Sequence, residues 1–218
     1  MTSTSPTTAL TATPRPRPAG RRGRPLAALL GLVVLLAGYT AWTQARPVRL
    51  TAAVEIEATP EEVWQVLTDF AAYPEWNPFM TSAEVTSKGG RLEKGARMRN
   101  VLHSGTGDTT FTPEILAAEP DRELRRLGRM GPGWIADGEH RFLIERTGPG
   151  RVRLTRSEEF TGLAVPFFAG QLKSDTLPQF RAMNQALAQR AGEAQPLRLR
   201  QARMPDRSQG CAGGTGRA

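Results

Sequence analysis

The chain has 218 residues, enough for one globular domain with additional segments, and its 29 basic and 21 acidic residues give a net charge of +8. The excess charge lies toward the two ends, because residues 46–192 contain 19 basic and 19 acidic residues. A neutral globular part without a recognition motif argues against a nucleic-acid-binding protein. The single cysteine, Cys211, excludes a disulfide framework and a thiolate metal site.

Residues 1–25 are rich in Thr, Ser, Pro and Arg, and this composition predicts a disordered basic segment. The next 18 residues, 26–43, carry no charge. As a helix they would extend ~27 Å, close to the ~30 Å hydrocarbon thickness of a bilayer. Tyr39 and Trp42 fall near the far end, where amphipathic rings favour the membrane interface. The sequence therefore predicts a transmembrane anchor over 26–45.

Charge flanking this apolar run predicts its orientation. The run follows five arginines, Arg15, Arg17, Arg21, Arg22 and Arg24. Only Arg46 and Arg49 follow closely, so the N-terminus is expected in the cytoplasm and the domain outside a single-pass cell membrane protein. The alternative is a signal peptide cleaved near Ala45, because Thr43-Gln44-Ala45 is a small-x-small site, and the domain would then be exported.

The pattern over 46–192 is that of one folded α+β domain. Alternation in "VRLTAAVEIEA" predicts a first strand, and "TPEEVWQVLTDF" follows it as an amphipathic helix. Thr59 is the expected N-cap of that helix, with Pro60 in its first position and Glu61 and Glu62 in its first turn. Further strands are predicted at about 81–87, 95–103, 108–118, 122–130, 134–146 and 151–161.

A closing helix is predicted over about 166–191, with Pro178 inside it. The helix either kinks at this proline or restarts there with Asp175 or Thr176 as its cap. Short links between successive strands indicate an antiparallel sheet. Beyond Gly192 the composition predicts a disordered basic tail over 193–218.

The segments "IEATPEEVWQVLTDFAAYPEWNPFM", "DGEHRF", "LTRSEEFTGL" and "FRAMNQALAQRA" resemble the START-like SRPBCC superfamily, in its bacterial polyketide cyclase/dehydrase-like branch. The resemblance covers about residues 50–191. It implies a helix-grip fold, in which two short helices follow the first strand and a curved antiparallel sheet wraps around the long C-terminal helix. It also implies an apolar cavity, in a family whose members bind lipids, hormones or polyketides and only some of which are enzymes.

Most of the residues predicted to bind a ligand have apolar side chains. The cavity rim of the resembled fold corresponds to the aromatic turn of Tyr73, Trp76 and Phe79, although these rings can equally seal one end of an ordinary core. The remaining candidate ligand-binding residues lie on two strands and the closing helix: Phe142, Arg156, Phe160, Phe168, Leu172 and Phe180.

A second lead is the hairpin around the turn at 147–150. If Arg146 pairs with Val152, His140 faces Glu158 on the same side of the sheet as Phe142 and Arg156. A register slip by two residues would place His140 opposite Arg156 instead. The His140–Glu158 pair is a candidate catalytic base with its orienting carboxylate, a ligand contact, or a structural pair.

These patterns predict a membrane-anchored START-like domain that binds an apolar or amphipathic small molecule, such as a lipid, isoprenoid or polyketide. The alternatives are a cyclase/dehydratase-type enzyme that uses His140 and Glu158, and a structural or interaction domain with a filled core. No metal and no cofactor are expected, because two histidines without repeated spacing do not suggest zinc and nucleotide-binding motifs are missing. A composition rich in Arg, Ala, Gly and Pro suggests a bacterial source.

Overall fold

A computed structural model of the chain describes residues 23–104 and 107–202, and it divides into one unit that ends at Tyr39 and a second that begins at Thr40. The helix α1 (Gly23–Ala45) contains the predicted anchor and begins earlier than the sequence suggested. Its part from Pro25 to Ala45 is long and apolar enough to cross a membrane, as a signal sequence also can be. Most of the predicted N-terminal disorder, residues 1–22, lies outside the described residues.

The second unit opens with β1 (Val48–Ile56), followed by α2 (Pro60–Thr68), a 3-10 turn (Phe70–Ala72) and α3 (Tyr73–Trp76). Thr59 caps α2 as predicted. Its hydroxyl accepts from the Glu62 N–H at 3.3 Å, and the Glu62 carboxylate accepts from the Thr59 N–H at 2.9 Å. This reciprocal capping box satisfies two N–H groups that the helix itself leaves unpaired.

Seven further strands complete the sheets, and every pairing is antiparallel. They are β2 (Met80–Val85), β3 (Met98–Ser104), β4 (Gly107–Phe111), β5 (Glu114–Glu119), β6 (Glu123–Met130), β7 (Ala136–Gly148) and β8 (Arg151–Thr161). Five of them form a sheet in the order β1-β8-β7-β6-β5, and β2-β3-β4 form a second sheet. The first and last strands of the domain are therefore neighbours.

The single strand predicted over 108–118 is wrong, because two strands occupy this range. β4 pairs with β3, whereas β5 pairs with β6 in the larger sheet. Pro113 lies between them and has no N–H to contribute to a ladder, and its carbonyl accepts from the Met98 N–H at 2.8 Å. The chain thus changes sheets at the proline.

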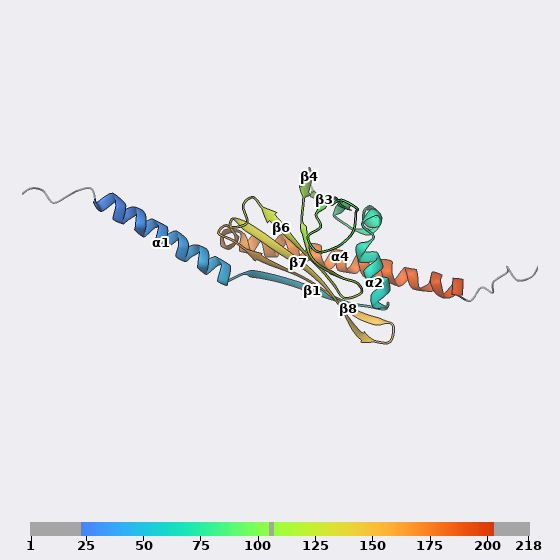
Figure 1. The fold of residues 1–218 in the computed structure, drawn as a ribbon. Helices are drawn as coiled ribbons and strands as arrows, with labels where there is room; N and C mark the ends of the chain where they lie inside the picture. Colours follow the sequence, from blue (N-terminus) through green and yellow to red (C-terminus); the bar gives the residue numbers. More distant parts are fainter. Residues whose placement is uncertain (1–22, 105–106, 203–218) are drawn as a thin grey trace, which may run out of the picture. The chain divides into compact units, whose positions relative to one another are not determined.

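The long helix α4 (Val165–Ala202) runs along the larger sheet (Figure 1). It continues through Pro178 without the restart that the sequence left open, and it extends past the predicted boundary at 192. The Asn184 side chain donates to the Ala52 carbonyl of β1 at 3.1 Å. α4 thereby supplies a partner to the edge strand of the sheet, which would otherwise present an unpaired carbonyl there. Residues 203–218 of the predicted disordered tail lie outside the described part of the chain.

The main core lies where α2 and α4 pack on one face of the larger sheet. Its fully buried side chains include Leu67, Tyr73, Phe142, Leu154 and Leu187. The predicted α+β architecture, with two short helices after the first strand, an antiparallel sheet and a long closing helix, is confirmed.

We expect Thr59→Ala to lower the free energy of unfolding by about 1 kcal/mol, because it removes the side-chain acceptor of the capping box. Urea denaturation of the full chain in an uncharged detergent, followed by tryptophan fluorescence, measures this loss. Glu62→Gln is the matched control and should keep most of the stability, since glutamine can still accept from the Thr59 N–H. A loss equal to that of Thr59→Ala would contradict this account of the cap.

Candidate functional site

The pairing of β7 with β8 places the polar residues of the hairpin on the side of the sheet that faces α4. Arg146 pairs with Val152, and His140 consequently lies opposite Glu158, as predicted. The alternative register, with His140 opposite Arg156, does not occur, since Arg156 faces Phe142.

His140 and Glu158 make a close contact at the centre of this face. The His140 Nε2 atom lies 2.7 Å from Glu158 Oε1. The carboxylate side chain is 5% exposed, whereas the imidazole keeps 26% of its surface exposed. With a neutral ring, Nε2 donates to Glu158 and Nδ1 becomes the acceptor. Nδ1 is buried and has no hydrogen-bond partner among the described residues.

The surroundings favour the neutral imidazole. Burial lowers the pKa of His140, and the positive charges of Arg126 and Arg156 lower it further, while the Glu158 carboxylate acts in the opposite direction. A neutral histidine with a free acceptor nitrogen can take a proton from a bound molecule or accept a hydrogen bond from it.

Arg126 extends the polar pair into a row across three strands. It lies on β6 directly opposite His140, so Arg126, His140 and Glu158 stand side by side on neighbouring strands. Arg126 is 2% exposed, and its Nη1 atom is buried without a partner in the described structure. Arg126 was not among the residues predicted from the sequence, although the alternation in "ELRRLGRM" places it on the same face as the buried Leu124.

Arg156 lies next to this row, on β8 two residues before Glu158, and is 4% exposed. Arg126, His140, Glu158 and Arg156 together are called the polar row below. Its guanidinium carbon is 3.9 Å from the centroid of the Phe180 ring and 5.2 Å from that of Phe142. Its Nη1 atom donates to the Met183 sulfur at 2.9 Å, and thioether sulfur is a weak acceptor. Burial, reinforced by the charge of Arg126, lowers the pKa of Arg156 to about 9, so the group remains charged at neutral pH.

Two glycines lie next to this row. Gly128 on β6 and Gly138 on β7 face each other, and Gly138 also faces Phe160. A Cβ atom at Gly138 would lie 2.8 Å from Glu158 Oε1, so glycine makes room for that carboxylate. A Cβ atom at Gly128 would meet only the Gly138 carbonyl oxygen, at 3.8 Å, and no side chain within 4 Å. The sheet surface over Gly128 is therefore open.

The three aromatic residues of the predicted turn differ in burial. Tyr73 is fully buried, its hydroxyl donates to the Leu67 carbonyl at 2.6 Å, and burial raises its pKa to about 12. Trp76 packs edge-on against Tyr73. Phe79 is half-buried, and its ring centroid lies 5.8 Å from the Arg156 guanidinium carbon. Of these three rings, that of Phe79 therefore lies against the Arg156 guanidinium.

The other predicted ligand-binding residues differ in burial. Phe142 and Phe180 are buried around Arg156, and half-buried Phe160 packs against the smaller cluster that contains Phe180. Leu172 is half-buried on α4. Phe168 is 54% exposed, near the start of α4, and does not belong to either buried cluster.

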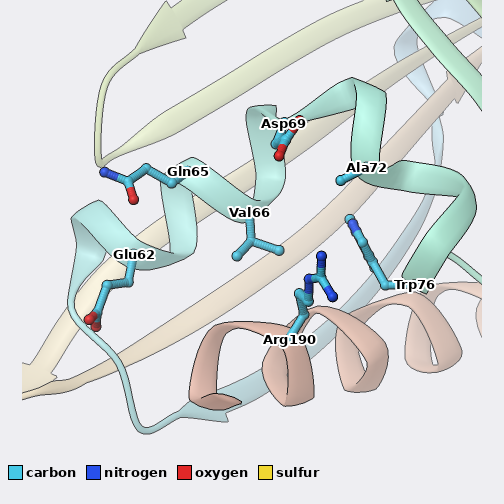
Figure 2. A pocket seen from close by; sticks show the side chains of 7 residues that line it. All are labelled: Glu62, Gln65, Val66, Asp69, Ala72, Trp76 and Arg190. Carbon is cyan, nitrogen blue, oxygen red and sulfur yellow. The ribbon is translucent and has the colours of Figure 1, made fainter. Parts of the chain in front are cut away.

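A groove of about 180 Å³ lies elsewhere, between α2, α3 and α4 (Figure 2). It is lined by Glu62, Gln65, Val66, Asp69, Ala72, Trp76 and Arg190. Small-molecule sites usually occupy ~300–1,000 Å³. Two of its charged groups are already engaged, because Glu62 caps α2 and Arg190 forms an ion pair with Glu75 at 2.6 Å. The groove is thus a weaker candidate than the polar row.

The chain matches one family of known proteins over most of its length. The model of a family described as "Polyketide cyclase / dehydrase and lipid transport" matches residues 47–192. No curated protein sequence matches the chain.

Solved structures share the fold at low sequence identity. A START superfamily protein from Mycobacterium smegmatis is 22% identical with a TM-score of 0.51, over 65% of this chain and 97% of that one. A norcoclaurine synthase from Thalictrum flavum, solved with a transition-state analogue, is 14% identical with a TM-score of 0.54, over 69% and 98%. The di-domain ARO/CYC BexL from the BE-7585A biosynthetic pathway is 12% identical with a TM-score of 0.54, and the match covers 65% of this chain and 45% of BexL. This chain therefore spans less than half of the di-domain protein.

The lowered pKa of His140 predicts a pH dependence of stability. The folded state resists a proton that the unfolded state accepts near the ordinary value of 6.5, so this contribution is fully present above pH 6.5 and is lost as the pH falls toward the folded pKa. We expect wild type to lose more unfolding free energy than His140→Gln between about pH 7.5 and about pH 5.

Urea denaturation of the full chain at both pH values measures this difference. Glutamine can still donate to Glu158 but does not titrate. His103→Gln is the control for removal of an imidazole outside the buried site, because the His103 side chain is exposed on β3 beside Asp108, and it should not reproduce the effect of His140→Gln. Equal pH slopes for wild type and His140→Gln would show that burial does not disfavour the charged ring.

Proposed function

Because the chain belongs to the polyketide cyclase/dehydrase and lipid transport family, we propose that its domain binds an amphipathic small molecule between the larger sheet and α4. The observation that carries this proposal is the polar row on the inner face. Arg126, His140 and Arg156 each have a buried nitrogen without a hydrogen-bond partner in the described structure. Buried polar atoms are nearly always paired, so a bound molecule is a natural source of the missing partners.

The surroundings of the row suit a molecule with a polar group and an apolar body. Phe79, Phe142 and Phe180 surround the Arg156 guanidinium, and half-buried Phe160 lies opposite Gly138, whose other neighbour, Gly128, leaves the sheet surface open. Glycine within a strand often marks a place where another group approaches the backbone closely. His140 keeps a quarter of its side chain exposed, which gives the row a route to solvent.

We place this function at a membrane. The apolar helix from Pro25 to Ala45 supports an anchor, and the basic residues before it support a cytoplasmic N-terminus. Large apolar side chains are also exposed at one end of the domain: Met130, Trp134, Phe167 and Phe168.

The chain enters the domain at that same end. Val48 starts β1 opposite Phe160, and the Leu163 N–H just beyond β8 donates to the Trp134 carbonyl at 3.0 Å. An apolar rim next to the entry of an anchored chain suits exchange of an amphipathic molecule with the bilayer. Secretion after cleavage near Ala45 would instead leave the same site in a soluble domain.

We expect Gly128→Leu to lower the amount of bound molecule severalfold, because a leucine side chain would occupy the open sheet surface beside Arg126 and His140. The full chain is purified in an uncharged detergent, and organic extracts of wild type and variant are compared by mass spectrometry. Gly170→Leu on α4 is the matched control, since a Cβ atom there meets nothing within 4 Å, and it should retain the wild-type extract.

This comparison also separates the proposal from a domain whose interior is filled by its own side chains. A filled core predicts extracts with no molecule that is enriched in wild type over Gly128→Leu. That result, with all three proteins folded by circular dichroism, would contradict internal ligand binding.

A second candidate function is cyclase- or dehydratase-type catalysis, favoured by the 2.7 Å contact between His140 and Glu158. Neutral His140 would remove a proton next to a carbonyl group, and the hydroxyl of a β-hydroxyketone would leave with a proton as water. A long-chain β-hydroxyketone is the probe, with loss of water followed by mass spectrometry. His140→Gln should lower the rate at least ~100-fold if the imidazole is the base. An unchanged rate would sink this candidate.

A further inference from the structure

We propose that the ligand of this domain is an acidic amphiphile, whose carboxylate or phosphate group binds between Arg126 and Arg156 on the α4-facing side of the sheet. The inference rests on the proposed internal site and adds the charge of its occupant. It also adds Arg126, which lies on β6, outside the β7–β8 hairpin.

The charges in the interior do not balance. Arg126, Arg156 and Glu158 are all at least nine-tenths buried, and His140 lies between Arg126 and Glu158 in the row. Glu158 is engaged by His140, and within residues 23–104 and 107–202 neither arginine forms an ion pair. Two buried cations therefore face one buried carboxylate. A buried charge without a counter-charge is strongly unfavourable, and one bound anion would remove the imbalance.

The two guanidinium groups lie near the same aromatic ring. Each guanidinium carbon lies 5.2 Å from the centroid of the same Phe142 ring, so the two carbons are at most twice that distance apart. Arg156 is also placed against the Phe180 ring at 3.9 Å. Aromatic rings hold a guanidinium by its face and leave the N–H groups at its edge available to an acceptor.

Donor atoms for an anion are present on both arginines. Arg126 Nη1 and Arg156 Nε are buried and have no acceptor in the described part of the chain. Among the described residues, the Arg156 side chain donates to the Met183 sulfur and to no other acceptor. Carboxylate and phosphate oxygens form short, charge-assisted bonds with guanidinium N–H groups and would replace that weak acceptor.

The apolar part of such a ligand has a path away from the arginines. Arg126 and Gly128 lie on the same face of β6, and no side chain lies within 4 Å of the position of a Cβ atom at Gly128. Gly128 is opposite Gly138, and Gly138 is opposite Phe160. These residues lie toward the end of the domain that exposes Trp134 and Phe168. An amphiphile would thus place its acidic group inward and its chain toward the apolar rim.

The test uses the full chain in an uncharged detergent with three probes that share one alkyl chain: dodecanoic acid, dodecyl phosphate and 1-dodecanol. Binding is measured by native mass spectrometry over a concentration series. We expect wild type to bind at least one acidic probe about tenfold or more tightly than the alcohol, and the stronger of the two acids identifies carboxylate or phosphate as the preferred group.

Arg126→Met and Arg156→Met should each weaken binding of the acidic probe by about tenfold to a hundredfold and leave dodecanol binding unchanged. Methionine keeps an unbranched side chain and removes an uncompensated buried charge, so these variants should fold, and retained dodecanol binding checks this. Arg125→Met is the matched control. Arg125 is the neighbour on the opposite face of β6, beside Glu139 at 3.1 Å, and its replacement should leave all three affinities as in wild type.

The possible results discriminate between this inference and the function on which it rests. Equal binding of the acids and the alcohol, lowered by Gly128→Leu, would overturn the acidic ligand and retain an internal apolar site. Acid binding that is unchanged in both arginine variants would also overturn the inference, because the acidic group of the probe would then bind to residues other than Arg126 and Arg156. Binding of none of the three probes would contradict the proposed amphiphile site itself.

Discussion

The pairing of β7 with β8 is the constraint on which the rest of the site depends. Side chains alternate between the two faces of a strand, so a shift of one residue in this hairpin would turn His140, Phe142 and Arg156 away from α4. The turn at Thr147–Gly150 and the apolar residues Ile144 and Leu154 hold the register, because their burial requires the same face. The interior charges are therefore placed by the hydrophobic pattern of the two strands.

The inner face of the sheet combines two environments that usually exclude each other. Toward α2, side chains such as Leu67, Tyr73 and Leu154 form an apolar core in which the tyrosine hydroxyl donates to a backbone carbonyl. Toward the entry of the chain, Arg126 and Glu158 are equally buried but are charged. Buried charges add little to stability compared with apolar side chains of similar volume, so a sequence that retains them suggests a role other than folding.

The fold alone does not choose among ligand binding, catalysis and a structural role. It is shared at 12–22% identity by a START superfamily protein, a norcoclaurine synthase and an ARO/CYC di-domain protein, and function in such a fold depends on the site that each sequence builds. In this chain the distinguishing features are local: an imidazole held by a carboxylate, two guanidinium groups on aromatic rings, and a glycine, Gly128, that leaves the sheet surface open.

The sequence by itself determined the features that depend on neighbours along the chain. Period-two alternation of residues predicted β7 and β8, and an assumed pairing of Arg146 with Val152 predicted that His140 faces Glu158. Thr59-Pro60 predicted the start of α2, and an uncharged run predicted α1. Only the tertiary structure decided contacts between segments distant in sequence. The division of 108–118 between two sheets, the interior position of Tyr73 and the approach of Arg126 to His140 each depend on a partner strand or helix, and local periodicity carries no information about that partner.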